Sequence, residues 1–114
     1  TQRDPLYTMT TGGVTTFNKS TARAFGRTGD RIRDNSIHPG VIETDRGAQT
    51  FVTRAAQIGT NDSDTAREQS LRMHPIGRLG VVDDIAKGIV YLTSDDAAFM
   101  TGAGLVVDGG YTAQ

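Results

Sequence analysis

Apolar and polar positions alternate with helical spacing over the first quarter of the chain. The apolar members of this pattern are Tyr7, Val14, Phe17, Ala22 and Phe25. They predict a helix over residues 7–25, after a polar loop over residues 1–6 that contains Pro5. Gly26 and Gly29 follow as signals that end the helix.

The middle of the chain combines one short apolar segment with a long polar one. Residues 32–37 predict a strand that the His-Pro-Gly triplet at 38–40 ends. Residues 45–72 are polar, with two weakly helical stretches at 48–58 and 64–72. This composition favours a mobile lid over a core element.

The last third of the chain contains the clearest helix pattern, over residues 82–94, after a loop at 75–80. Six apolar residues form one stripe along this helix: Val82, Ile85, Ala86, Ile89, Val90 and Leu92. Asp83 and Asp84 stand in the first turn, where the helix dipole favours negative charge. Residues 104–108 then predict a buried parallel strand, which a turn follows.

The order of strand, helix and strand indicates a parallel α/β arrangement. Two parallel strands do not make a self-sufficient sheet, because parallel sheets need cover on both faces and further strands beside them. We therefore expect residues 1–114 to be a single segment that forms the C-terminal part of a larger α/β domain, truncated before its other half.

Composition and charge exclude several classes of function. Twelve basic and thirteen acidic side chains give a net charge of -1, which argues against a protein that binds nucleic acid. The chain has no Cys, so disulfide scaffolds, zinc–thiolate sites and thiol nucleophiles are excluded. His38 and His74 lack metal-ligand spacing, and no apolar run approaches the roughly 20 residues of a membrane helix. We expect a soluble, cytoplasmic protein that holds no metal.

Short motifs follow one another along nearly the whole chain. They are Tyr7-x-x-x-Thr11-Gly12-Gly13, residues 32–44 with Pro39-Gly40-x-Ile42-x-Thr44, the loop at 75–80, Asp83-Asp84-Ile85-Ala86, residues 91–97, Thr101-Gly102 and Val107-Asp108-Gly109-Gly110-Tyr111. In this order they resemble the C-terminal portion of the short-chain dehydrogenases/reductases. Residues 107–114 are similar to bacterial members that act on secondary alcohols and ketones, including hydroxysteroid and (R)-alcohol dehydrogenases.

The resemblance implies a doubly wound Rossmann-type parallel sheet. It also implies an oxidoreductase that transfers hydride between NAD or NADP and a small alcohol or carbonyl substrate. The family's catalytic tyrosine matches Tyr7. Its nicotinamide-binding turn matches Pro39, Gly40, Ile42 and Thr44, where the backbone at Ile42 and the hydroxyl of Thr44 would hold the carboxamide.

The resemblance also concerns assembly. Residues 82–94 and 104–111 correspond to segments that commonly form a subunit interface in the family, which implies a homo-oligomer. A second hypothesis therefore stays open beside the enzyme. The chain would then be a non-catalytic remnant that acts as an assembly module through these same segments.

Four departures from the family pattern bear on function. The first is the absence of the family's cofactor half, with its Gly-rich turn, its ribose-binding Asp and the catalytic Ser upstream of the Tyr. Thr11 stands at the Lys position of the family's Tyr-x-x-x-Lys motif. Asp34 stands where an apolar residue is usual, and Thr21 replaces a usual Leu.

The missing Lys matters because of the pKa of tyrosine. A tyrosine can exchange the proton that accompanies hydride transfer, but its unperturbed pKa of about 10 is too high for work near neutral pH. A cation four residues away shares a helix face with the tyrosine and lowers that pKa. Thr11 carries no charge, and Lys19 lies roughly 18 Å from Tyr7 along a helix. We therefore expect impaired catalysis.

Simpler interpretations stay open for several of these residues. Tyr7 also suits the start of an amphipathic helix, and residues 39–44 suit an ordinary turn after a strand. Asp34 is costly in a strand that is covered on both faces, but not at a wet edge. The basic run from Arg23 to Arg33 favours a solvated helix end over a phosphate-binding tract.

Overall fold

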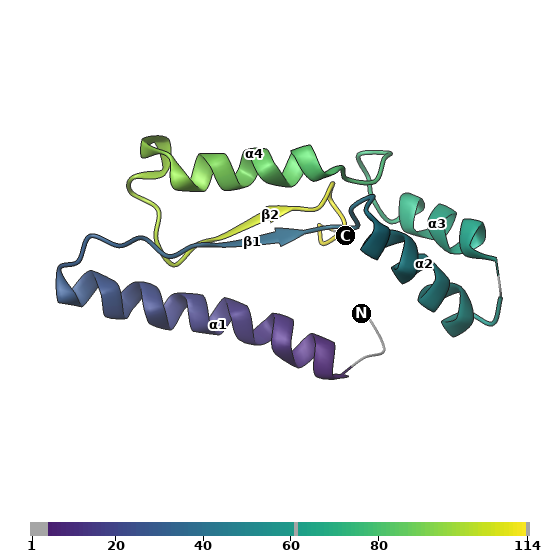
Figure 1. The fold of residues 1–114 in the computed structure, drawn as a ribbon, viewed down its shortest axis with the longest axis horizontal. Coiled ribbons are helices and arrows are strands. Elements are labelled where there is room, and N and C mark those ends of the chain that lie inside the picture. Colours follow the sequence, from purple (N-terminus) through teal and green to yellow (C-terminus); the bar gives the residue numbers. More distant parts are fainter. Residues whose placement is uncertain (1–4, 61, 114) are drawn as a thin grey trace. The chain divides into compact units, whose positions relative to one another are not determined.

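The fold was analysed in a computed structural model, which describes residues 5–60 and 62–113. Its elements are α1 (Pro5–Thr28), β1 (Ser36–Pro39), α2 (Asp45–Gln57), α3 (Ser63–Arg72), α4 (Val82–Thr93), the short 3-10 helix η1 (Asp95–Ala97) and β2 (Gly104–Val107) (Figure 1). The chain divides into two compact units. The first unit is Thr1–Ile37 with Ile89–Leu105, and the second unit is His38–Gly88 with Val106–Gln114.

In the first unit, α1 confirms the predicted helix and extends it at both ends. It begins at Pro5, which a first helical turn tolerates because the amide there needs no partner within the helix. The predicted loop at 1–6 is therefore wrong for Pro5 and Leu6, and its other residues lie outside the described part of the chain. Gly26 does not end the helix; Gly29, with a φ of 77°, does.

The two strands pair in parallel, so the predicted α/β class is confirmed. Ser36 donates its backbone N–H to the Ala103 carbonyl (3.0 Å), and Gly40 donates to the Val107 carbonyl (3.1 Å). The partner residue advances along β2 as the donor advances along β1, as it does in a parallel pair. Figure 1 shows both arrows pointing the same way.

The strand predicted over residues 32–37 lies further along the chain, at Ser36–Pro39. The reason is that Asn35 bonds to the segment before β2 through its side-chain amide and not through the backbone hydrogen bonds of a strand pair. Its amide donates to the Met100 carbonyl (2.9 Å) and accepts from the Ala103 N–H (3.1 Å). β2 matches its prediction in position, but the expectation that it is buried is wrong, because its residues alternate between exposed and half-buried.

A polar cluster joins α1 to the segment before β1 in the first unit. Asp34 accepts hydrogen bonds from the Asn18 amide (3.2 Å) and from the Thr21 hydroxyl. Asn18 is buried, while Thr21 and Asp34 are half-buried. The carboxylate is therefore neither in a strand nor unpaired. Two of the departures from the family pattern, Thr21 and Asp34, are bonded to each other.

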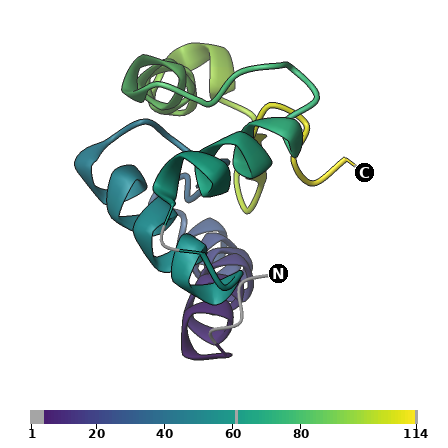
Figure 2. The ribbon, with the colours of Figure 1, turned by 90° about the vertical axis from the view of Figure 1, so that its right-hand side faces the viewer.

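In the second unit, α2 and α3 confirm both predicted helical stretches, and they lie side by side (Figure 2). A hydrophobic cluster forms here from Phe51, Ala55, Ala66 and Leu79, with Val41 and Leu71 packed against it. The expectation that residues 45–72 contribute no core element is therefore wrong. α2 and α3 are polar over most of their surface, but each has one narrow apolar face. The small alanines on these faces let the two helices approach closely.

The predicted helix over residues 82–94 is confirmed by α4, but its apolar stripe is not covered. No residue of α4 is buried, and Val82 and Val90 are 61% and 66% exposed. Among the helices of residues 5–60 and 62–113, none is long and apolar enough to cross a membrane.

We predict that Thr21 and Asp34 stabilise the first unit as a pair. Thr21→Val removes the hydroxyl, and Asp34→Asn keeps the acceptor for Asn18 while replacing the oxygen that accepts from Thr21. Each single variant and the double variant, compared by urea unfolding, should give a coupling energy of about 1–2 kcal/mol, since the bond involves a charged acceptor.

Thr16→Val on the exposed side of α1 is the matched control for the change from Thr to Val. It should show no coupling to Asp34→Asn. Additive losses at Thr21 and Asp34 would mean that their hydrogen bond adds nothing to stability.

Candidate functional site

The turn that runs from Pro39 to Thr44 lies between β1 and α2 in the second unit. An isolated parallel bridge joins Ile42 to Gly80: Gly80 donates to the Val41 carbonyl (2.9 Å), and Glu43 donates to the Gly80 carbonyl (2.8 Å). In such a bridge the N–H of the central residue points away from its partner. The Ile42 N–H has no hydrogen-bond partner among residues 5–60 and 62–113, so it can donate to a ligand.

Thr44 ends the turn as the N-cap of α2. Its Oγ1 accepts a hydrogen bond from the Gly47 N–H at 3.0 Å, which satisfies one of the free amides of the first helical turn. A hydroxyl that accepts one bond still has its own proton to donate. Within the described residues this proton has no acceptor, so the turn offers a second donor two residues after Ile42.

Two glycines allow the turn to adopt this shape. A Cβ on Gly40 would lie 2.8 Å from the Asp108 Cα, and a Cβ on Gly47 would lie 2.2 Å from the Ile42 carbonyl oxygen. Both distances are below any ordinary contact. The turn therefore lies directly against the end of β2 and the first turn of α2.

An ion pair joins the loop before α4 to the first turn of that helix. The Arg78 guanidinium donates to both carboxylate oxygens of Asp84, at 2.6 and 2.8 Å, and the Val81 N–H donates to the same carboxylate at 2.8 Å. The bond from Arg78, followed by the one from Val81, holds the pKa of Asp84 far below its ordinary value. A cavity of about 180 Å³ borders these groups and is lined by residues that include Gly40, Ile42, His74, Arg78, Asp84 and Lys87.

Tyr7 and Thr11 both lie on α1, in the first unit, whereas the turn belongs to the second. The Thr11 hydroxyl donates to the Tyr7 carbonyl at 2.8 Å, one helical turn back. It is therefore bonded within its own helix and carries no charge. Because α1 is continuous, the next basic residue along it, Lys19, lies roughly 18 Å from Tyr7.

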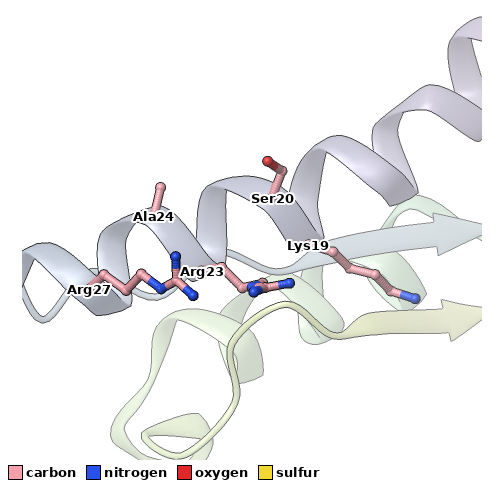
Figure 3. Close-up of a pocket in the computed structure, with 5 residues that line it drawn as sticks. All are labelled: Lys19, Ser20, Arg23, Ala24 and Arg27. Atoms are coloured by element: carbon pink, nitrogen blue, oxygen red, sulfur yellow. The ribbon is translucent and has the colours of Figure 1, made fainter.

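A groove on α1 gathers basic side chains. Lys19, Arg23 and Arg27 extend along one side of the helix (Figure 3), and none of them forms an ion pair with another described residue. All three are exposed. The expectation of a solvated helix end is wrong for Arg33, because its guanidinium donates to the Ser94 (3.2 Å) and Met100 (3.4 Å) carbonyls.

Residues 1–112 match the pattern of the family described as "Enoyl-(Acyl carrier protein) reductase". The chain is 43% identical over 104 residues to an L-rhamnose 1-dehydrogenase (NAD(P)(+)) of Sphingomonas sp.. It is 36% identical over 108 residues to a cyclohexanol dehydrogenase of Acinetobacter sp.. The chain belongs to the short-chain dehydrogenase/reductase family. The resemblance expected from the motifs is confirmed.

The match extends to solved structures. A short-chain dehydrogenase family protein of Francisella tularensis superposes on the whole chain with a TM-score of 0.87 at 32% identity. The Rossmann-type fold of this short-chain dehydrogenase/reductase chain is thereby confirmed. The chain spans less than half the length of each of these proteins. It covers 46% of the Francisella structure. The match to the rhamnose enzyme covers 91% of this chain and 36% of that enzyme, and the match to the cyclohexanol enzyme covers 95% of this chain and 36% of that enzyme.

Sequence reasoning had not placed His74 at the turn of this short-chain dehydrogenase/reductase. The Val41 N–H donates to His74 Nε2 at 3.2 Å, and the imidazole is only 3% exposed. The motif around it showed only a histidine before a proline. Its one signal was the position of a polar side chain immediately before the loop at 75–80.

We predict that Asp84 stabilises the chain in a pH-dependent way. A carboxyl whose pKa is lowered in the folded state contributes stability above its unfolded pKa of about 3.9, and that contribution is lost as the pH falls toward the folded value. Thermal unfolding from pH 7 to pH 2, followed by circular dichroism, should show a Tm difference between the chain and Asp84→Asn that is largest at pH 7 and shrinks below pH 4. Asp96→Asn controls for the loss of one surface carboxylate. A Tm difference that stays constant down to pH 2 would contradict the prediction.

Proposed function

We propose that this chain supplies the C-terminal half of a dehydrogenase domain that interconverts a secondary alcohol and a ketone with NAD or NADP. In this proposal Pro39 and Gly40 shape the turn, and the Ile42 N–H and Thr44 hydroxyl hold the nicotinamide carboxamide. When bound, the nicotinamide supplies or accepts the hydride. The observation that carries the proposal is the pair of adjacent donors, Ile42 N–H and Thr44 O–H, without partners in the described residues.

The donor set suits a carboxamide. A carboxamide oxygen accepts two hydrogen bonds, and a hydroxyl can serve its NH₂ group as an acceptor as well. The Ile42 donor is a backbone N–H, which the bridge leaves pointing away from Gly80. Two curated relatives, named for the oxidation of cyclohexanol and of L-rhamnose, support an alcohol or carbonyl as the substrate class.

Tyr7 is proposed as the acid and base of this reaction. Reduction of a ketone leaves an alkoxide that takes a proton from the tyrosine, and oxidation returns it. The tyrosine needs a nearby cation to hold its phenolate near neutral pH. Thr11 cannot supply one, because its hydroxyl is uncharged and bonded to the Tyr7 carbonyl. Catalysis with Thr11 therefore requires a cation from another source, and its rate is low without one.

We predict that nicotinamide mononucleotide shifts the amide resonances of Ile42 and Thr44 in a saturable way, measured by NMR titration of the chain. Thr44→Ser keeps both the helix cap and the hydroxyl donor, so it should bind like the wild type. Thr44→Asp keeps the cap acceptor but loses the donor, so it should bind about tenfold more weakly.

Two outcomes of the titration would contradict these predictions. If Ile42 and Thr44 do not shift at millimolar ligand, the turn is not a nicotinamide site. If Thr44→Asp binds as tightly as the wild type and Thr44→Ser, the Thr44 hydroxyl donates nothing to the ligand, and Thr44 has the role of a helix cap alone.

A second candidate function is assembly through residues 82–94 and 104–111. It is favoured by α4, which buries none of its residues, and by the exposed apolar side chain of Val106 on β2. Monomeric proteins seldom expose large apolar patches, and such patches commonly mark contacts with another chain. On this alternative the chain acts as a non-catalytic module that pairs with a copy of itself.

We predict that the chain sediments as a dimer or larger species in analytical ultracentrifugation. Val90→Glu places a charge on the exposed face of α4 and should convert the chain to a monomer. Val52→Glu is the matched control, because Val52 is exposed to a similar degree, 54% against 66%, but lies on α2. A wild-type monomer at high concentration, or equal effects of the two variants, would contradict assembly through α4.

A further inference from the structure

His74 is a buried polar side chain whose two ring nitrogens both lie within hydrogen-bond distance of the backbone. Nδ1 is 2.6 Å from the Ser70 carbonyl oxygen, and Nε2 is 3.2 Å from the Val41 backbone nitrogen. A backbone N–H can only donate, so Nε2 must be the acceptor. The ring is therefore the tautomer that carries its proton on Nδ1 and donates it to Ser70.

The helices of the second unit hold this ring in place. Ser70 is buried in the last turn of α3, and its hydroxyl donates to the Ala66 carbonyl at 2.9 Å. The Arg54 guanidinium of α2 donates to the same hydroxyl at 3.3 Å. On the other side, the Tyr111 ring packs against the imidazole with the centroids 5.2 Å apart. The acceptor at Nε2 is thus fixed by α2, by α3 and by the C-terminal turn.

The acceptor in turn fixes one donor of the proposed nicotinamide site. The Val41 carbonyl and the Ile42 N–H belong to the same planar peptide group and point in opposite directions. Gly80 holds the Val41 carbonyl, and His74 holds the Val41 N–H on the preceding peptide group. With both peptide groups of Val41 held, its backbone dihedrals are fixed, and so is the direction of the Ile42 N–H.

We infer that His74 is a positioning residue, which orients the Ile42 donor toward the nicotinamide carboxamide through its bond to the Val41 N–H. The inference rests on the proposed function for the identity of the ligand, but not for the bond itself. It links the helix pair that forms the core of the second unit to the turn that binds the cofactor. A histidine that only fills space would need volume at this position, not an acceptor at Nε2.

Two substitutions separate the two hydrogen bonds. His74→Gln places an amide oxygen near the Nε2 position, so it can still accept from Val41. His74→Asn places its amide near Nδ1, so it can still donate to Ser70 but does not reach Val41. Both replace the ring with a smaller amide, which matches them for the loss of packing against Tyr111.

The readouts are amide hydrogen exchange at Val41 and the affinity for nicotinamide mononucleotide, both measured by NMR on the full chain. Relative to wild type, Val41 should exchange about tenfold faster in His74→Asn and within about threefold in His74→Gln. The affinity should follow the same order. Equal exchange at Val41 in the two variants would overturn the inference, and so would a split in exchange without a split in affinity when the wild type binds.

The proposed function can fail without this bond failing. If Val41 exchange separates the two variants but the wild type does not respond to the ligand, the positioning of the turn stands and the nicotinamide proposal falls. If neither variant folds, the wild type still decides the matter. Long-range ¹H–¹⁵N correlation of the imidazole should show the tautomer protonated at Nδ1, and the tautomer protonated at Nε2 would overturn the inference.

Discussion

The hydrogen bond from the Gly40 N–H to the Val107 carbonyl, at the end of the parallel strand pair, fixes where the turn after β1 begins. Immediately after it, Gly40 passes so close to Asp108 that no side chain fits between them. The following peptide groups are then held one after another, by His74 and by Gly80. The turn is therefore shaped by bonds to its backbone, one of them to the buried His74 ring, while the Val41 side chain packs against the hydrophobic cluster of the second unit. A short loop can thus present a fixed backbone donor because groups outside the loop hold its peptide groups.

The same parallel pair explains why so much apolar surface is uncovered. Parallel strands require cover on both faces, yet β2 alternates between exposed and half-buried residues and α4 buries none. The core lies instead between α2 and α3. Both functions proposed for the chain would cover the exposed apolar residues of β2 and α4. In one case the rest of a dehydrogenase domain covers them, and in the other a second copy of the chain does. The two functions differ in what the turn from Pro39 to Thr44 then does.

Elements with a broad periodic stripe could be predicted from the sequence, as α1 and α4 show. The position of β1 could not, because Asn35 is bonded through its side chain to a segment more than sixty residues later, and no local pattern reports that. The core around Ala55 and Ala66 was missed because alanines in a polar stretch carry little hydropathy. The Pro-Gly-x-Ile-x-Thr motif predicts the turn after β1. The role of His74 could not be predicted, because it depends on contacts with Val41, Ser70 and Tyr111, which lie in three separate segments of the chain.

The bond between Thr21 and Asp34 also makes the two positions unequal in what they tolerate. With leucine at position 21 the Asp34 carboxylate would lack one of its two side-chain donors, whereas Thr21 keeps a partner whatever residue stands at position 34. The Thr21 hydroxyl also lies 3.0 Å from the Phe17 carbonyl, the ordinary bond of a helical threonine to the preceding turn. Substitution at position 34 therefore leaves Thr21 with a hydrogen bond, whereas Thr21→Leu leaves the half-buried Asp34 carboxylate with Asn18 as its one side-chain donor among the described residues. The dependence between the two positions is one-sided.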